Sequence, residues 1–258
     1  MKKRSGKSGP RPATPKGPSA PKEQRRPRFS TELSVLYEDD AVVVLDKPAG
    51  LPAVPIPGSD TPSALALLSA RLKLIRQRAF VVHRIDRFTS GILLFAKTQR
   101  DRDPLIRQFL GHAPVRQYLA VIRGHLDSAE ATLVHYFRRE GMWQQARTEK
   151  DPQASRAELQ YSVEQVFPEA SLVRVELVTG LQNQIRAQFA AIGHPVIGDR
   201  KYHAAESSER LIDRVALHAT HLEFVHPRSG EKVSVECELP ADFRRLIQEL
   251  SRAARARR

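Results

Sequence analysis

The chain has 258 residues and a formal net charge of +13, from 42 Lys and Arg against 29 Asp and Glu. The single cysteine, Cys237, excludes an internal disulfide and a site built from several thiolates, and it favours a reducing compartment. No stretch approaches the ~18 consecutive apolar residues of a membrane span, and prolines follow the basic N-terminus where a secretory signal needs an apolar core. We therefore expect a cytoplasmic protein without membrane attachment.

The positive charge is concentrated in three segments. Residues 1–30 hold ten Lys and Arg, one Glu and six prolines, which predicts a disordered basic tail that either attracts RNA phosphates or serves solubility. Residues 251–258 add four arginines as a second expected tail, whereas residues 31–250 are neutral overall. Inside this body, Arg71 to Arg107 carry ten cations and three acids, which suits a phosphate-bearing partner. Solvated helix faces and loops are the alternative interpretation of this cluster.

Hydrophobic periodicity predicts more strands than helices. In chain order we expect a short strand and turn at 35–40, a buried strand at 41–45, a helix at 63–74, a buried strand at 92–96, a helix at 101–110 and a strand at 115–122. Further strands are expected at 157–166, 171–178, 216–225 and 233–238, with helices at 184–192 and 242–250. Because the strands do not alternate strictly with helices, an α+β domain on a largely antiparallel sheet is favoured.

One carboxylate lies among three cations in residues 83–91, HRIDRFTSG, directly before the apolar run 92–96. Asp86 is flanked by Arg84 and Arg87, and opposite charges nearby favour the ionised form of a carboxylate. This arrangement indicates a nucleophile or a general base. On spacing alone, an Asp that initiates a turn before Thr-Ser-Gly is an equally good interpretation.

Residues 83–97, HRIDRFTSGILLFAK, resemble the signature of the RluA family of RNA pseudouridine synthases, H-R-L-D-x-x-T-S-G followed by apolar residues and A-K. Residues 37–50 are similar to the family's opening motif, which ends in K-P-A-G. Residues 116–120 resemble its K-x-Y-x-A motif, and residues 179–186 resemble T-G-R-T-H-Q-I-R. The resemblance covers roughly residues 33–240. It implies the pseudouridine synthase fold, a mixed, mostly antiparallel curved sheet with a central catalytic cleft flanked by helices and loops.

The resemblance also implies a function: isomerisation of specific uridines in rRNA or tRNA to pseudouridine, without a metal or another cofactor. Asp86 would be the catalytic carboxylate and Arg186 its ion-pair partner. Whether Asp86 attacks the sugar, attacks the ring or removes a ribose proton stays open. The ring of Tyr118 would stack on the target base, although a lone strand tyrosine is more often core. Arg84 would fill the space left by the flipped base, with phosphate contact alone as the alternative.

The same motifs supply the remaining predicted RNA contacts: His83, Arg87, Thr89, Arg116 and Gln184. In the third motif, Leu181-Gln182-Asn183 stands in place of R-T-H, which removes a cation and an imidazole and predicts altered RNA contacts of that loop. The family often carries a separate S4-type RNA-binding module, for which we expect no room here. We therefore expect one catalytic domain over residues 31–250, acting as a monomer.

Two other functions remain open at this stage. A non-catalytic RNA-binding protein on an inherited enzyme fold is favoured by the altered loop and the basic tail. A phosphate-ester nuclease is disfavoured, because no cluster of carboxylates for metal ions is evident. His218, His221 and His226 do not predict a metal site either, since residues 218 and 221 fall on opposite faces of a strand.

Overall fold

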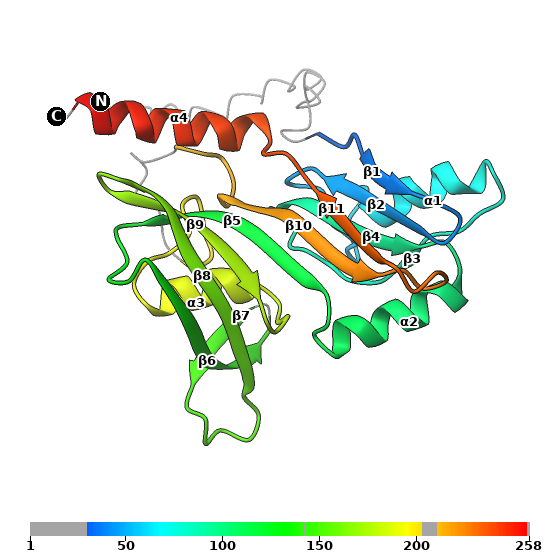
Figure 1. Ribbon diagram of the computed structural model, residues 1–258, viewed down its shortest axis with the longest axis horizontal. Helices are drawn as coiled ribbons and strands as arrows, with labels where there is room; N and C mark the ends of the chain where they lie inside the picture. Colours follow the sequence, from blue (N-terminus) through cyan, green and yellow to red (C-terminus); the bar gives the residue numbers. More distant parts are fainter. Residues whose placement is uncertain (1–29, 142, 203–210, 257–258) are drawn as a thin grey trace, which may run out of the picture.

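The computed structural model describes residues 30–141, 143–202 and 211–256. The predicted disordered tail, residues 1–30, therefore lies outside the described residues except for Ser30. Within these described ranges, eleven strands form one sheet and four helices pack against it (Figure 1). Among the helices of the described residues, none is both long and apolar enough to cross a membrane.

The strands follow the order β1-β2-β4-β10-β5-β9-β8-β6-β7 across the sheet, with β3 paired to β4 and β11 paired to β10. Their bounds are β1 Ser34–Glu38, β2 Val42–Lys47, β3 Phe80–Val81, β4 Ser90–Ala96, β5 Val115–Arg123, β6 Glu130–Glu140, β7 Trp143–Arg147, β8 Ser155–Phe167, β9 Ala170–Leu177, β10 Leu217–Val225 and β11 Lys232–Glu236. Among the strand pairs of the described residues, only that of β4 with β10 is parallel. The predicted α+β fold with a mixed, mostly antiparallel sheet is confirmed.

The strands β2 and β4 read as continuous apolar runs because both of their faces are buried. One face packs against helix α1, Ala64–Lys73, through Leu68 and Leu72. The strand residues of this core are Val43, Leu45, Leu93 and Phe95. The alternate residues face the larger core that runs under the rest of the sheet: Val42, Val44, Ile92 and Leu94.

The helices begin where the sequence supplies caps. Ser63 caps α1 by accepting from the Ala66 amide, and Thr98 caps α2, Gln99–Leu110, by accepting from the Asp101 amide. Helix α2 packs on β4 and β10, α3 (Gln184–Ala191) on β7, and α4 (Ala241–Ala256) on β8 (Figure 1). All four helices match predicted ones to within a few residues, except at the end of α4.

Two predictions about the chain's organisation were wrong or incomplete. Helix α4 continues to Ala256, so residues 251–256 are not a tail; Ala and Arg are strong helix formers, and the Ser251 hydroxyl donates to the Ile247 carbonyl. The hairpin β6–β7 was not predicted. Its residues alternate between exposed and half-buried and include many charges, so the apolar periodicity is weak.

The single parallel contact in the sheet requires a glycine. Gly91 pairs with Ala219 of β10 and has φ +103°. A Cβ at Gly91 would lie 2.2 Å from the Ala219 carbonyl oxygen, closer than any real contact. The Thr-Ser-Gly end of the signature segment therefore brings the loop that carries Asp86 against β10.

We expect Gly91→Ala to lower the free energy of unfolding by about 3 kcal/mol, from backbone strain together with a clash against fixed backbone. The control is Gly141→Ala, where φ is also positive (+60°) but no atom lies within 4 Å of the added Cβ. Its expected cost is only about 1 kcal/mol. Urea unfolding measures both; equal losses would show that the β4–β10 contact adds nothing to the φ strain.

Candidate active site

Asp86 lies in the loop between β3 and β4, and its side chain is 21% exposed. Arg186, in the first turn of α3, donates through Nη1 to Asp86 Oδ2 at 3.2 Å. The two residues are 100 positions apart in the chain. The ion pair predicted from the sequence is therefore present, with one carboxylate and its cation partner in a partly buried site.

The guanidinium of Arg186 is itself fixed by a second carboxylate. Its Nε and Nη2 donate to the two oxygens of Asp199 at 2.7 and 2.8 Å, and the Asp199 side chain is fully buried. Burial lowers the pKa of Arg186, but the hydrogen bonds and charges of Asp199 and Asp86 outweigh burial and raise it. Arg186 consequently stays cationic.

The substituted motif residue Asn183 contacts the same cation. Its Oδ1 accepts from Arg186 Nη1 at 2.7 Å, so the nitrogen that reaches Asp86 is also held by the residue directly before α3. Asn183 begins helix α3 with φ +56°, a left-handed conformation that Asn tolerates better than most residues. The change from the family pattern thus leaves the Asp86 partner fixed.

Tyr118 lies on β5 and is 7% exposed, with its ring in the main core. Burial raises the pKa of its hydroxyl to about 12; the charge of Arg116 opposes this and that of Asp86 adds to it. The phenol is therefore neutral, and Tyr118 lies near enough to Asp86 for the charge of Asp86 to raise its pKa. The structure brings all three predicted catalytic residues, Asp86, Arg186 and Tyr118, into one region.

A buried lysine connects the K-P-A-G loop to the loop of Asp86. Lys47 Nζ donates to the carbonyls of Pro48, Leu51 and Arg87, at 3.0, 2.8 and 3.1 Å. Burial lowers the pKa of Lys47 to about 7, with the charge of Asp86 acting in the opposite direction. Arg87 Nε also donates to the Gly50 carbonyl, so the two loops are joined from both sides.

Two of the six predicted RNA-binding side chains are exposed: Arg84 and Arg87. They lie on either side of Asp86, and the Arg87 guanidinium is 5.3 Å from the ring centroid of Phe88, which is 38% exposed. Both cations are placed where RNA phosphates or bases could approach the carboxylate.

The other four are used inside the protein: His83, Thr89, Arg116 and Gln184. His83 Nε2 accepts from the Leu94 amide, and its ring stacks on Phe109 at 4.6 Å between centroids. Burial lowers the pKa of His83 to about 3, and the charge of Arg116 adds to this, so the ring is neutral. Thr89 is 2% exposed.

Arg116 and Gln184 organise the loop of the third motif. Arg116 Nη2 donates to the carbonyls of residues 177–179, and a Cβ at Gly180 would lie 2.7 Å from Arg116 Nη1. The Gln184 amide bonds to the Thr179 hydroxyl, the Leu181 amide and the Glu158 carbonyl. The prediction that these four side chains contact RNA directly finds no support in their geometry.

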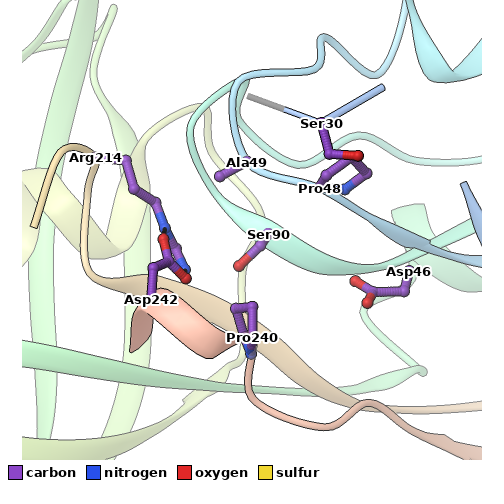
Figure 2. A pocket seen from close by; sticks show the side chains of 8 residues that line it. All are labelled: Ser30, Asp46, Pro48, Ala49, Ser90, Arg214, Pro240 and Asp242. Atoms are coloured by element: carbon purple, nitrogen blue, oxygen red, sulfur yellow. Dashed lines mark hydrogen bonds and ion pairs between the residues drawn. The ribbon is translucent and has the colours of Figure 1, made fainter. Parts of the chain in front are cut away.

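A cavity of about 250 Å³ adjoins the start of β4. Figure 2 shows its lining: Ser30, Asp46, Pro48, Ala49, Ser90, Arg214, Pro240 and Asp242. The Arg214 and Asp242 side chains form a two-bond ion pair there, at 2.7 and 2.9 Å. None of the three predicted catalytic residues lines this cavity. It is therefore separate from the Asp86 site, although Ser90 of the signature segment lines it.

Sequence reasoning missed Asp199 and Tyr202, which contact Arg186, and it also missed Lys201 and Trp143, which lie against Tyr202. Asp199 directly follows Gly198, which has φ +76°. A polar residue after a glycine turn was the one signal that the sequence offered for it. Among the described residues, no group of three or more His, Cys, Asp or Glu side chains could hold a metal ion.

Comparison with known proteins identifies the family. The family described as RNA pseudouridylate synthase matches residues 41–191. Ribosomal large subunit pseudouridine synthase D of Zymomonas mobilis is 34% identical over 230 residues, which cover 84% of this chain and 73% of that protein. The protein of the same name from Xanthomonas campestris is 35% identical over 237 residues, which cover 84% of this chain and 69% of that protein. The solved structure of human RNA pseudouridylate synthase domain containing 4 shares the fold, with TM-score 0.70 at 20% identity over 84% of this chain and 92% of its own.

The protein is an isomerase that acts on RNA. The chain belongs to the RNA pseudouridylate synthase family, which confirms the resemblance seen in its motifs.

We expect Asp199→Asn to lower activity at least about 10-fold, because Arg186 loses the charged partner that orients it toward Asp86. The free energy of unfolding should fall by about 3 kcal/mol, since a buried ion pair is broken. The matched control is Glu164→Gln, which removes a surface pair with Arg174 and should cost under about 1 kcal/mol. Wild-type kcat in Asp199→Asn would contradict the positioning role.

A buried histidine predicts a pH dependence of stability. Ser90 Oγ and His218 Nδ1 are joined by a 2.8 Å hydrogen bond across the β4–β10 contact. Burial lowers the pKa of His218 from 6.5 to about 4, and the charge of Arg214 adds to this. His218 therefore binds a proton below pH 6.5 in the unfolded chain, whereas in the folded protein it binds one only near pH 4. This stability is complete above pH 6.5 and is lost as the pH falls toward 4.

We expect His218→Gln to flatten the loss of stability between pH 6.5 and pH 4, where one such group contributes up to about 1.4 kcal/mol per pH unit. Urea unfolding at pH 7 and pH 5 measures the difference. His112→Gln, at an exposed position, is the control and should keep the wild-type slope. Parallel pH profiles for His218→Gln and the wild type would contradict the assignment.

Proposed function

We propose that this protein converts a uridine of large-subunit ribosomal RNA into pseudouridine, with Asp86 as the catalytic carboxylate. The observation that carries this proposal is the ion pair of Asp86 with Arg186. It holds one carboxylate oxygen at 3.2 Å, while the side chain keeps 21% exposure toward the surface. A carboxylate that is oriented from inside the protein and still accessible is suited to act on a nucleotide.

The isomerisation breaks the bond between the ribose C1′ and the base N1, turns the base and joins C1′ to C5. The C5 proton is lost and N1 gains a proton, so no net oxidation or hydrolysis takes place. A target base has to leave the RNA stack before its ribose can reach Asp86. Arg186 donates to the carboxylate and holds it in one orientation while this takes place.

The surrounding residues support the same proposal. Tyr118 offers a neutral, mostly buried ring beside Asp86, against which the flipped base can lie. Arg84 is exposed two residues from Asp86, where its planar guanidinium can enter the space that the base leaves. Both roles follow the family resemblance and are tested by the kinetics of their variants.

The choice of ribosomal RNA rests on the relatives. Those from Zymomonas mobilis and Xanthomonas campestris are named for the large ribosomal subunit. Incubating the protein with unmodified transcripts of large-subunit rRNA and, separately, with unmodified tRNA transcripts distinguishes the two substrate classes. Pseudouridine in the rRNA supports the proposal, and pseudouridine only in tRNA would move the substrate to the other class.

We expect Asp86→Asn to lower the rate of isomerisation by at least about 100-fold, because the amide keeps the shape but not the charge of the carboxylate. Pseudouridine is measured by primer extension after carbodiimide modification of the transcript. RNA affinity in a filter-binding assay should stay within about 3-fold of wild type, since only one side chain of the RNA-facing surface changes and its shape is kept.

The matched control is Asp60→Asn, the same substitution at an exposed loop position, which should leave the rate unchanged. Full isomerisation by Asp86→Asn would exclude Asp86 as the catalytic carboxylate. RNA binding without isomerisation by the wild type would instead favour a non-catalytic RNA-binding protein.

A further inference from the structure

The protein's one tryptophan lies close to the catalytic centre and is poorly covered. Trp143 begins β7, and its side chain is 47% exposed. It belongs to none of the sequence motifs that define the active site. Figure 1 shows the hairpin β6–β7 extending from the body of the sheet, with α3 packed on β7. The exposed part of this indole is available to a ligand, and the case for one rests on the contacts that surround it.

A chain of contacts ties the indole to Asp86. The rings of Trp143 and Tyr202 meet edge to face, with 5.7 Å between centroids. The Tyr202 hydroxyl accepts from the Gln144 amide at 3.0 Å, which anchors the hairpin. The Tyr202 ring also contacts Arg186, with 5.5 Å between the ring centroid and the guanidinium carbon. Arg186 in turn donates to Asp86. The indole is thus held on the Arg186 side of the catalytic carboxylate.

A cation lies over both rings. Lys201 Nζ is 5.1 Å from the Trp143 ring centroid and 5.3 Å from that of Tyr202. Burial lowers the pKa of Lys201, and Arg186 and Arg139 add to this, while Asp86 and Asp199 oppose it. Asp86 is therefore near enough for its charge to act on Lys201. Aromatic rings beside a cation are the combination with which proteins hold single-stranded nucleotides.

We propose that Trp143, Lys201 and Tyr202 form a stacking platform for a base of the RNA that flanks the target uridine. The indole stacks on the base, and Lys201 meets the phosphate of the same nucleotide. Because the target base itself lies at Asp86 and Tyr118, the platform takes a neighbouring nucleotide of the splayed strand. This inference rests on the proposed function in one respect, that the strand at Asp86 is RNA.

The single tryptophan allows a direct test by fluorescence. The full chain carrying Asp86→Asn is titrated with a 20-nucleotide single-stranded RNA that contains uridine, and binding is followed in parallel by the anisotropy of a 3′ dye. We expect at least about half of the indole emission to be quenched at saturation, because base stacking quenches indoles and the platform contains the only one. An RNA with abasic sites in place of its bases should bind through its phosphates without this quenching. Saturated binding with unchanged emission would overturn the platform.

Kinetics provide the second test. With a large-subunit rRNA transcript, Trp143→Ala should raise KM about 5- to 100-fold, as expected for the loss of one base stack, and change kcat less than 3-fold. Trp143→Phe keeps a ring and should stay within about 3-fold of wild type in both constants. The control Val166→Ala removes another exposed apolar side chain, 58% exposed near the far end of β8, and should leave KM unchanged. A Trp143→Ala variant with wild-type KM would contradict the proposal.

The two proposals fail in different ways. If the wild type isomerises no RNA but its indole is quenched by bases, the proposed function fails and the platform stands. If the wild type isomerises rRNA and the indole is not quenched, only the platform fails. The melting temperature of each variant shows whether folding has changed, and Trp143→Phe remains informative if Trp143→Ala is destabilised.

Discussion

The geometry of the proposed catalytic centre depends on one guanidinium that bonds to two carboxylates. Arg186 gives its Nε and Nη2 edge to the buried Asp199 and its Nη1 to Asp86. Because Asp199 is fully buried, the cation cannot swing toward solvent without leaving a buried charge unpaired. The more exposed carboxylate therefore has a fixed partner in the free protein, and the cost of ordering it is met during folding rather than when RNA binds.

That constraint joins two halves of the sheet. Asp86 follows β3 and precedes β4, whereas Arg186 and Asp199 belong to the segment after β9, and the two halves meet where β4 runs parallel to β10. Gly91 permits the close approach of β4 to the Ala219 backbone of β10. Lys47 donates to the carbonyl of Arg87, in the loop that carries Asp86. Each contact uses backbone atoms or buried side chains, so the position of Asp86 is set by the fold and not by flexible surface groups.

The sequence allowed prediction of the motifs, the sheet class and the Asp86–Arg186 pair, because these depend on apolar runs and on a strong resemblance. It did not show which polar motif residues face inward. His83 and Gln184 are polar neighbours of the catalytic residues, which favours ligands by composition, but both satisfy backbone groups inside the protein. Hairpin β6–β7 and Trp143 were not predicted, because a partly buried strand with many charged residues shows little apolar periodicity.

The departure of the third motif from the family pattern changes the surface more than the centre. Asn183 accepts from Arg186 Nη1, so the residue at that position helps to fix the orientation of the cation. The arginine that the family places two residues earlier is Leu181 here, which packs against the buried cluster of Phe137, Ala157 and Ala187. Positive charge for RNA near Asp86 must then come from other segments, chiefly Arg84 and Arg87 on the catalytic loop and Lys201 beside the aromatic rings. We therefore expect RNA recognition in this protein to depend less on the third motif and more on the loop of Asp86 and on hairpin β6–β7.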